Sequence, residues 1–233
     1  MRAKEPHRRS LPAGALVPYR ALVQQFHGAP PGKIYLLHGQ ALVFRLSLSA
    51  AAQALQHGVP LTLIDGSNRF DAYYLADIAR AVTARGAGPP ITPEEMLERI
   101  YVSRAFTCYQ MEALITDRLP EFLERSRSPV VIIFGLLDTF YDEQAPLFEV
   151  RQSLRRIIVS LRNLRQKGIA VLLASLDLQP ASHQRGELFP ALARAVDSVF
   201  AVSAGESGLR ITREIQGGTR AVLREDTGSG EQR

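Results

Sequence analysis

The sequence has a single cysteine, Cys108, among its 233 residues, so an internal disulfide is excluded. It also has no apolar run near the roughly 18 to 20 residues that a membrane-spanning helix needs. Its basic first residues are followed by no apolar stretch and do not resemble a signal peptide. These absences predict a cytoplasmic protein that has neither disulfides nor membrane spans.

Lysine is scarce, because only Lys4, Lys33 and Lys167 occur and arginine supplies almost all of the positive charge. The formal net charge is +5. Arginine binds phosphate bidentately and stacks on bases, so nucleic acid is a natural partner for such a chain. A GC-rich genome that favours arginine codons would explain the same excess, and composition alone does not separate the two explanations.

What the sequence does contain is a series of short apolar runs separated by segments of helical length. Continuous runs rich in leucine and β-branched residues are typical of strands buried on both faces of a parallel sheet. Five such runs predict strands at 34–38, 61–65, 100–103, 130–134 and 169–174. The intervening segments are long enough for crossover helices, which we expect at 47–57, 70–85, 108–126 and 149–167.

The chain after residue 174 has a different pattern. Strand-like runs alternate with glycine-containing turns, which predicts a meander over 198–203, 209–214 and 220–223. The sequence therefore predicts an α/β fold, a mostly parallel sheet flanked by helices with a C-terminal antiparallel extension. We expect a flexible basic N-terminal arm, one core domain and a disordered polar tail, over 1–20, 21–224 and 225–233.

The helix expected at 149–167 has the clearest amphipathic pattern. Its apolar residues recur at the spacing of one buried face: Val150, Leu154, Ile157, Ile158, Leu161 and Leu164. Its arginines lie off that stripe, and four of them are candidate nucleic-acid contacts: Arg151, Arg155, Arg162 and Arg165. A solvated helix face is the alternative interpretation.

The turn after the first strand is where a phosphate-binding loop, G-x-x-x-x-G-K-[ST], would lie in such a fold. Gly39 fits its first position. Phe44 stands at the second glycine, Arg45 at the lysine and Leu46 at the hydroxyl that holds magnesium. Phenylalanine adds bulk, arginine keeps the charge without the compact ammonium, and leucine does not bind Mg²⁺. Gly39 and Arg45 are therefore the candidate nucleotide contacts of a degenerate Walker A segment.

Several blocks in order resemble the ATPase core of the RecA/RadA strand-exchange recombinases, over about residues 15–224. The blocks lie at 27–34 (HGAPPGKI), 63–70 (LIDGSNRF), 103–111 (SRAFTCYQM), 131–134 (VIIF) and 168–173 (GIAVLL). The resemblance implies a RecA-like P-loop core and a role in DNA recombination and repair. It also implies partner binding through a sheet edge or a basic arm.

The departures from this family pattern concern the residues of catalysis. In this alignment the family's catalytic glutamate falls at Ser67, its magnesium-associated aspartate at Phe134 and its polar switch residue near Leu176. Water activation, phosphate binding and Mg²⁺ placement are separate requirements of nucleotide hydrolysis. Their joint alteration argues against an ATPase, so we expect no catalytic residue, no metal site and no required ATP or Mg²⁺.

Other candidate residues have weaker patterns. Asp138, Asp142 and Glu143 follow the fourth predicted strand and would hold a metal ion only from a shifted position, with a solvated loop the alternative. Arg104 fits a strand-end salt bridge, and Cys108 fits a small buried residue. The histidines have no metal-ligand spacing.

Three functions remain open from the sequence. The leading hypothesis is a non-catalytic paralog of the recombinases, a pseudo-ATPase that binds DNA or a repair protein as an accessory factor and is a possible oligomer. The first alternative is an atypical P-loop enzyme in which Arg45 replaces the lysine and Asp65 or the group at 138–143 holds Mg²⁺. The second is a RecA-fold module that regulates through protein contacts alone.

Overall fold

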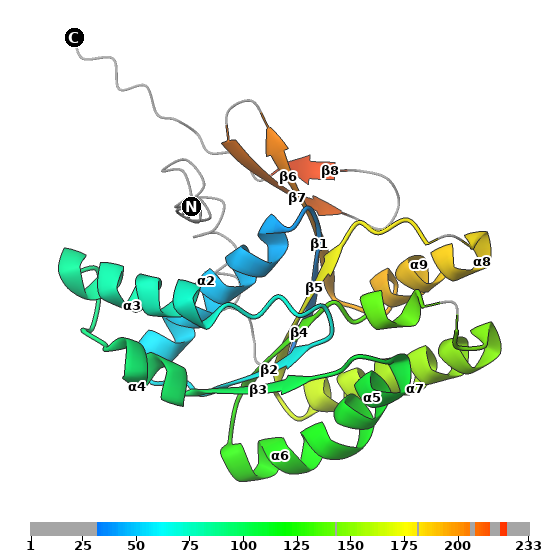
Figure 1. The fold of residues 1–233 in the computed structure, drawn as a ribbon, viewed down its shortest axis with the longest axis horizontal. Coiled ribbons are helices and arrows are strands. Elements are labelled where there is room, and N and C mark those ends of the chain that lie inside the picture. Colours follow the sequence, from blue (N-terminus) through cyan, green and yellow to red (C-terminus); the bar gives the residue numbers. More distant parts are fainter. Residues whose placement is uncertain (1–31, 143, 181, 206–207, 215–219, 223–233) are drawn as a thin grey trace, which may run out of the picture.

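The computed structural model describes residues 32–142, 144–180, 182–205, 208–214 and 220–222. Its strands form one eight-stranded sheet in the order β3-β2-β4-β5-β1-β6-β7-β8 (Figure 1). They are β1 (Ile34–Gly39), β2 (Leu61–Asp65), β3 (Ile100–Arg104), β4 (Val130–Phe134), β5 (Ala170–Leu176), β6 (Ser198–Gly205), β7 (Gly208–Glu214) and β8 (Arg220–Val222). Neighbouring strands from β3 to β6 are parallel, and β7 and β8 are antiparallel.

Helices cover both faces of this sheet (Figure 1). The helices that pack on one face are α2 (Leu42–Gln56), α3 (Ala72–Arg85) and α4 (Pro93–Glu98). The helical segments that pack on the other are α5 (Cys108–Ala113), η2 (Leu114–Arg118), α6 (Leu119–Ser126), α7 (Leu147–Gln166) and α9 (Leu188–Ala193). The short η3 (Asp138–Phe140) and α8 (His183–Gly186) complete the described helical segments.

Alternation along the central strands explains the two cores. On β1, Tyr35 and Leu37 belong to the cluster beneath α2, whereas Ile34 and Leu36 belong to the cluster beneath α7. Every residue of β1, β2 and β4 is buried, as expected for strands covered on both faces. The predicted α/β architecture, with its mostly parallel sheet and antiparallel C-terminal extension, is confirmed.

One predicted helix has a different start, and one helix was not predicted. The first helix begins at Leu42 and not at 47, because residues 42–46 continue the apolar, buried pattern of α2 and are helical. The helix α4 was not predicted, although Thr92 and Glu95 form a reciprocal capping box with Pro93 at the helix start.

The predicted helix at 108–126 is continuous but contains the π-helical turn η2. Pro120 has no N–H to continue the α-helical ladder, and its ring crowds the carbonyl group four residues earlier. The wider π turn at that point relieves the conflict. The predicted arm at 1–20 and the predicted tail at 225–233 lie outside the described residues. No helix in the described part of the chain has the length and apolar character needed to cross a membrane.

Candidate functional site

The turn after β1 is too short to wrap a phosphate group. Only Gln40 and Ala41 separate Gly39, the last residue of the strand, from the first helical residue Leu42. The Val43 N–H donates to the Gln40 carbonyl at 3.0 Å, so the first turn is already closed as a helix. A phosphate loop needs a longer glycine-rich segment whose N–H groups surround the anion, and the two residues of this turn do not form one.

Gly39 has a packing role of its own. Its φ is 141°, and a Cβ on this residue would lie 2.0 Å from the carbonyl oxygen of Val202 on the neighbouring strand β6. Glycine is therefore needed at the end of β1 because the backbone of β6 approaches it closely. This contact explains why the first position of the degenerate Walker A segment is a glycine, and no bound ligand is needed to explain it.

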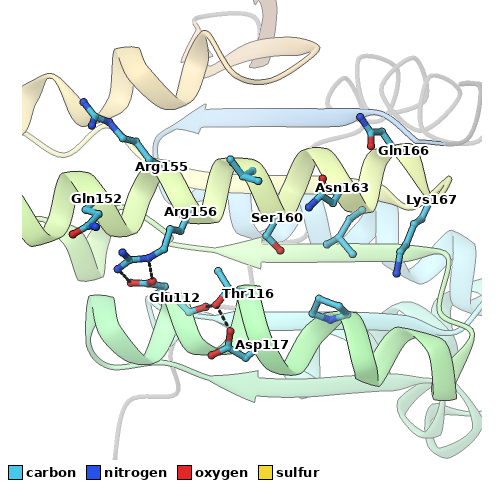
Figure 2. Close-up of a pocket in the computed structure, with 13 residues that line it drawn as sticks. Glu112, Thr116, Asp117, Gln152, Arg155, Arg156, Ser160, Asn163, Gln166 and Lys167 are labelled. Carbon is cyan, nitrogen blue, oxygen red and sulfur yellow. Dashed lines mark hydrogen bonds and ion pairs between the residues drawn. The ribbon is translucent and has the colours of Figure 1, made fainter.

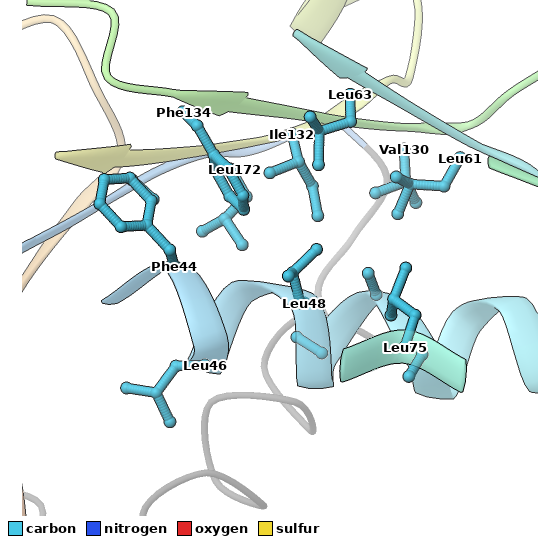
Figure 3. Packing of buried hydrophobic residues seen from close by; sticks show 14 of the residues in the cluster. Phe44, Leu46, Leu48, Leu61, Leu63, Leu75, Val130, Ile132, Phe134 and Leu172 are labelled. Atoms are coloured by element: carbon cyan, nitrogen blue, oxygen red, sulfur yellow. The ribbon is translucent and has the colours of Figure 1, made fainter. Parts of the chain in front are cut away.

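Two phenylalanines pack against each other where the RecA/RadA pattern has a glycine and an aspartate (Figure 3). The ring of Phe44 meets the ring of Phe134 edge to face, with a centroid distance of 5.0 Å and an interplanar angle of 62°. Both side chains are buried in the core beneath α2, and Leu46 is fully buried as well. The side chains at the positions of the second glycine, the magnesium-associated aspartate and the metal-binding hydroxyl are therefore all part of the hydrophobic core.

Arg45 is half-buried on α2 and lies near α3. Its guanidinium carbon is 5.4 Å from the centre of the Tyr74 ring, a cation–π distance. The Tyr74 hydroxyl in turn shares a 2.8 Å hydrogen bond with Ser49. Burial raises the pKa of Tyr74, and the Ser49 hydrogen bond and the neighbouring Arg45 both oppose that rise. Arg45 thus makes a structural contact that links α2 to α3.

Asp65, at the end of β2, uses its carboxylate to hold the following loop. One oxygen accepts the backbone N–H groups of Ser67 and Arg69, and the other accepts the N–H of Phe70 at 2.9 Å. The side chain is almost completely buried. Three backbone donors thus engage both oxygens of the carboxylate, which makes Asp65 a loop anchor.

Asp138 is the first residue of η3, four residues after the end of β4, and lies close to Ser67. A Cβ placed on Gly135 would be 2.8 Å from both the Asp138 Oδ2 and the Ser67 Oγ. Burial raises the pKa of Asp138 to about 6, Arg69 opposes this rise, and Asp65 adds to it. The Asp138 Oδ1 and the Ser67 Oγ are both buried without a hydrogen-bond partner among the described residues.

The proposed metal group at 138–143 is only partly described. Asp142 is exposed and accepts the backbone N–H of Gln144, and Glu143 lies outside the described residues. Across the described parts of the chain, no three His, Cys, Asp or Glu side chains come together as a metal-binding group. Arg104 is exposed at the end of β3, and Cys108 is buried, with its pKa raised by burial.

His38 was missed as a candidate by the sequence interpretation. It is buried at the end of β1, where its Nδ1 is 2.7 Å from the Asp177 Oδ1 and its Nε2 is 3.4 Å from the Glu214 Oε2. The Nε2 contact has the distance of an ion pair without hydrogen-bond geometry. No sequence pattern indicates this arrangement, because the two carboxylates come from distant parts of the chain.

The outer face of α7 has an excess of positive charge. The helix contains five arginines and one acidic residue, Glu149. The four predicted contact residues are all exposed: Arg151, Arg155, Arg162 and Arg165. At 100° per residue they fall within a sector of about 80° beside the buried stripe, so the helix presents them together.

The four arginines differ in their partners. Arg165 forms an ion pair with Asp197 at 3.1 Å, and Arg151 donates a long hydrogen bond to the Gln184 carbonyl at 3.5 Å. Arg155 and Arg162 make no hydrogen bond or ion pair with another described residue. The middle of this face therefore has two guanidinium groups without counter-charges from the described chain.

A groove of about 880 Å³ runs beside these arginines, between α7 and the helices α5, η2 and α6 (Figure 2). Arg156 reaches across it to an ion pair with Glu112, and Arg155 points away from the α5 side. Its α7 wall extends from Gln152 to Lys167, about 22 Å at the rise of an α-helix. Of the four exposed arginines, Arg155 lines the groove and Arg151, Arg162 and Arg165 do not, so the groove runs along one side of the arginine face.

The sequence matches no protein-family model and no curated protein.

Proposed function

We propose that this chain binds nucleic acid through the exposed arginine face of α7 and does not hydrolyse nucleotides. The resemblance to the RecA/RadA recombinases extends the proposal to an accessory role in DNA recombination and repair. The observation that supports it most directly is the pair Arg155 and Arg162, which are exposed and have no counter-charge among the described residues.

The geometry of this face suits a phosphate backbone. Arg155 and Arg162 are seven residues apart, about 10 Å along the helix, and the full row from Arg151 to Arg165 spans about 21 Å. At 3.4 Å per base pair, that row is as long as roughly six base pairs of duplex. Each guanidinium group offers a planar fork of N–H donors that matches a phosphate group.

The packing at the degenerate phosphate loop supports the non-hydrolytic part of the proposal. Phe44 and Phe134 fill the region with an aromatic pair, and the helix α2 starts only two residues after β1. Asp65, the alternative metal ligand, already accepts three backbone N–H groups. A nucleotide would have to displace core side chains and unwind the first turn of a helix.

A paired comparison of arginine variants tests the proposal. In Arg155→Ala/Arg162→Ala we expect DNA affinity, measured by fluorescence anisotropy at fixed salt, to fall about 10- to 100-fold, since two charge-assisted contacts are lost. Arg80→Ala/Arg85→Ala removes the same charge from the exposed side of α3 and is the matched control. Equal losses in both double variants would mean that net charge alone acts and would contradict a site on α7.

A second candidate function is partner binding at the edge of the sheet. The strand β3 is the last strand on its side of the described sheet, and its Tyr101 and Val102 are 41% and 37% exposed. An edge strand presents unpaired N–H and C=O groups that another chain can extend. This edge is where a recombinase-type partner would add a strand.

A further inference from the structure

The first turn of α7 carries a highly exposed aromatic ring. Phe148 is 76% exposed, whereas most of the apolar residues of this helix are buried. A second aromatic residue, Tyr109 on α5, is 47% exposed and donates its hydroxyl hydrogen bond to the carboxylate of Glu149, the residue after Phe148. The carboxylate of Glu149, the one acidic side chain of α7, therefore already accepts a hydrogen bond at the start of the helix.

Phe148 continues the line of the two unpaired arginines. Phe148, Arg155 and Arg162 stand at positions i, i+7 and i+14 of one straight helix, and each step of seven residues rotates the position by only about 20°. The ring therefore lies about 10 Å along the axis from the first guanidinium group and about 21 Å from the second. The exposed ring and the two positive charges on one line therefore offer an apolar stacking surface and two anion-binding groups.

We propose that Phe148 stacks on an unpaired base of a single-stranded nucleic acid whose phosphates follow Arg155 and Arg162. This inference rests on the proposed function, the binding of nucleic acid by α7. A flat apolar ring gains most from the face of a base, and in a duplex those faces are covered by neighbouring bases. Arginines alone would bind duplex and single strand alike, so the ring gives the surface its preference for unpaired nucleotides.

The absence of tryptophan from the sequence makes the contact directly observable. Phe148→Trp introduces the sole indole at the proposed stacking position, and Tyr73→Trp introduces it on α3, where the native tyrosine is 86% exposed. We expect an oligo(dT) strand of about 15 nucleotides to quench Phe148→Trp emission, with the same midpoint as binding measured by anisotropy. The emission of Tyr73→Trp stays unchanged.

Affinity measurements separate stacking from charge. Phe148→Ala weakens binding of oligo(dT) roughly 5- to 100-fold and leaves binding of a duplex of equal length unchanged, and Phe148→Tyr restores the single-strand affinity. Unchanged Phe148→Trp emission overturns the inference, and so does an equal loss for single strand and duplex. In either case a loss in Arg155→Ala/Arg162→Ala still supports the proposed function. If oligo(dT) and duplex both fail to bind, the inference and the proposed function fall together.

The same face would also suit an acidic protein. Poly-glutamate is the probe for that alternative because it has the charge of the oligonucleotide without its bases. If poly-glutamate changes the Phe148→Trp emission and oligo(dT) does not, the stacking inference is overturned in favour of a protein partner.

Discussion

Asp138 retains a carboxylate where the fold disfavours its charge, so removal of that charge should stabilise the protein. The pKa of this side chain rises from 3.8 to about 6, chiefly because of burial. A rise of about two pH units corresponds to roughly 3 kcal/mol of cost for the charged form. Because the carboxyl group is partly exposed, solvent screens part of this cost, and we expect Asp138→Asn to raise the free energy of unfolding by about 1–2 kcal/mol at pH 8.

The pH dependence gives this prediction its sign. A carboxyl group with a raised pKa in the folded state binds more protons folded than unfolded between about pH 4 and pH 6. Its contribution to stability is therefore most favourable below about pH 4 and is lost as the pH rises through about 6. The advantage of Asp138→Asn should be largest above pH 6 and should shrink toward zero near pH 4.

Urea unfolding of the two proteins at pH 8 and at pH 4 measures this difference. Asp142→Asn is the matched control, because it removes the same charge from an exposed position four residues away. We expect the control to change stability by less than about 0.5 kcal/mol at both pH values. An Asp138→Asn effect that is independent of pH, or a loss of stability at pH 8, would refute the reasoning.

Two further predictions concern the core and the sheet edge. Phe44→Ala should lower the free energy of unfolding, measured in urea, by about 3–5 kcal/mol, because it leaves a cavity against Phe134. The same variant should not bind ATP in calorimetry, because the turn after β1 remains helical. Measurable ATP affinity would contradict this. Val102→Lys should leave the urea midpoint nearly unchanged, since the side chain is 37% exposed. The variant should abolish capture of a recombinase-type partner if β3 is the docking edge. Capture that survives the change would place the partner elsewhere.

Much of the fold was predictable because its strands are continuous apolar runs. Runs such as 130–134 have no polar residue to place in water, so burial on both faces was the only arrangement open to them. The helix α7 was predictable for the opposite reason, since its apolar and charged residues separate cleanly onto two faces. The start of α2 was missed because residues 42–46, which are helical, had been assigned to the expected phosphate loop.

The candidate site was predictable only where it lies on one element. Spacing along α7 placed four arginines on one face, and all four are exposed there. Spacing gave no information on their partners, so it did not separate the paired Arg165 from the unpaired Arg162. Phe148 looked like an ordinary apolar residue, and only its exposure distinguishes it from the core.

Contacts between distant segments had no sequence signal at all. Arg185 is almost completely buried and donates hydrogen bonds to the carbonyl oxygens of Phe140 and Ala145, which fix the segment after β4. The contact between His38 and Asp177 joins positions 139 residues apart. Such pairs depend on the order of strands in the sheet, which local propensity does not determine.

The central claim, that the arginine face of α7 binds a polynucleotide, is tested most directly by the salt dependence of DNA affinity. The logarithm of the binding constant falls linearly with the logarithm of the salt concentration, with a slope set by the number of phosphates contacted. We predict that Arg155→Ala/Arg162→Ala makes this slope shallower by about 1.5 and that Arg80→Ala/Arg85→Ala leaves it unchanged. An unchanged slope in the α7 variant, or no binding by the native chain at low salt, would contradict the account.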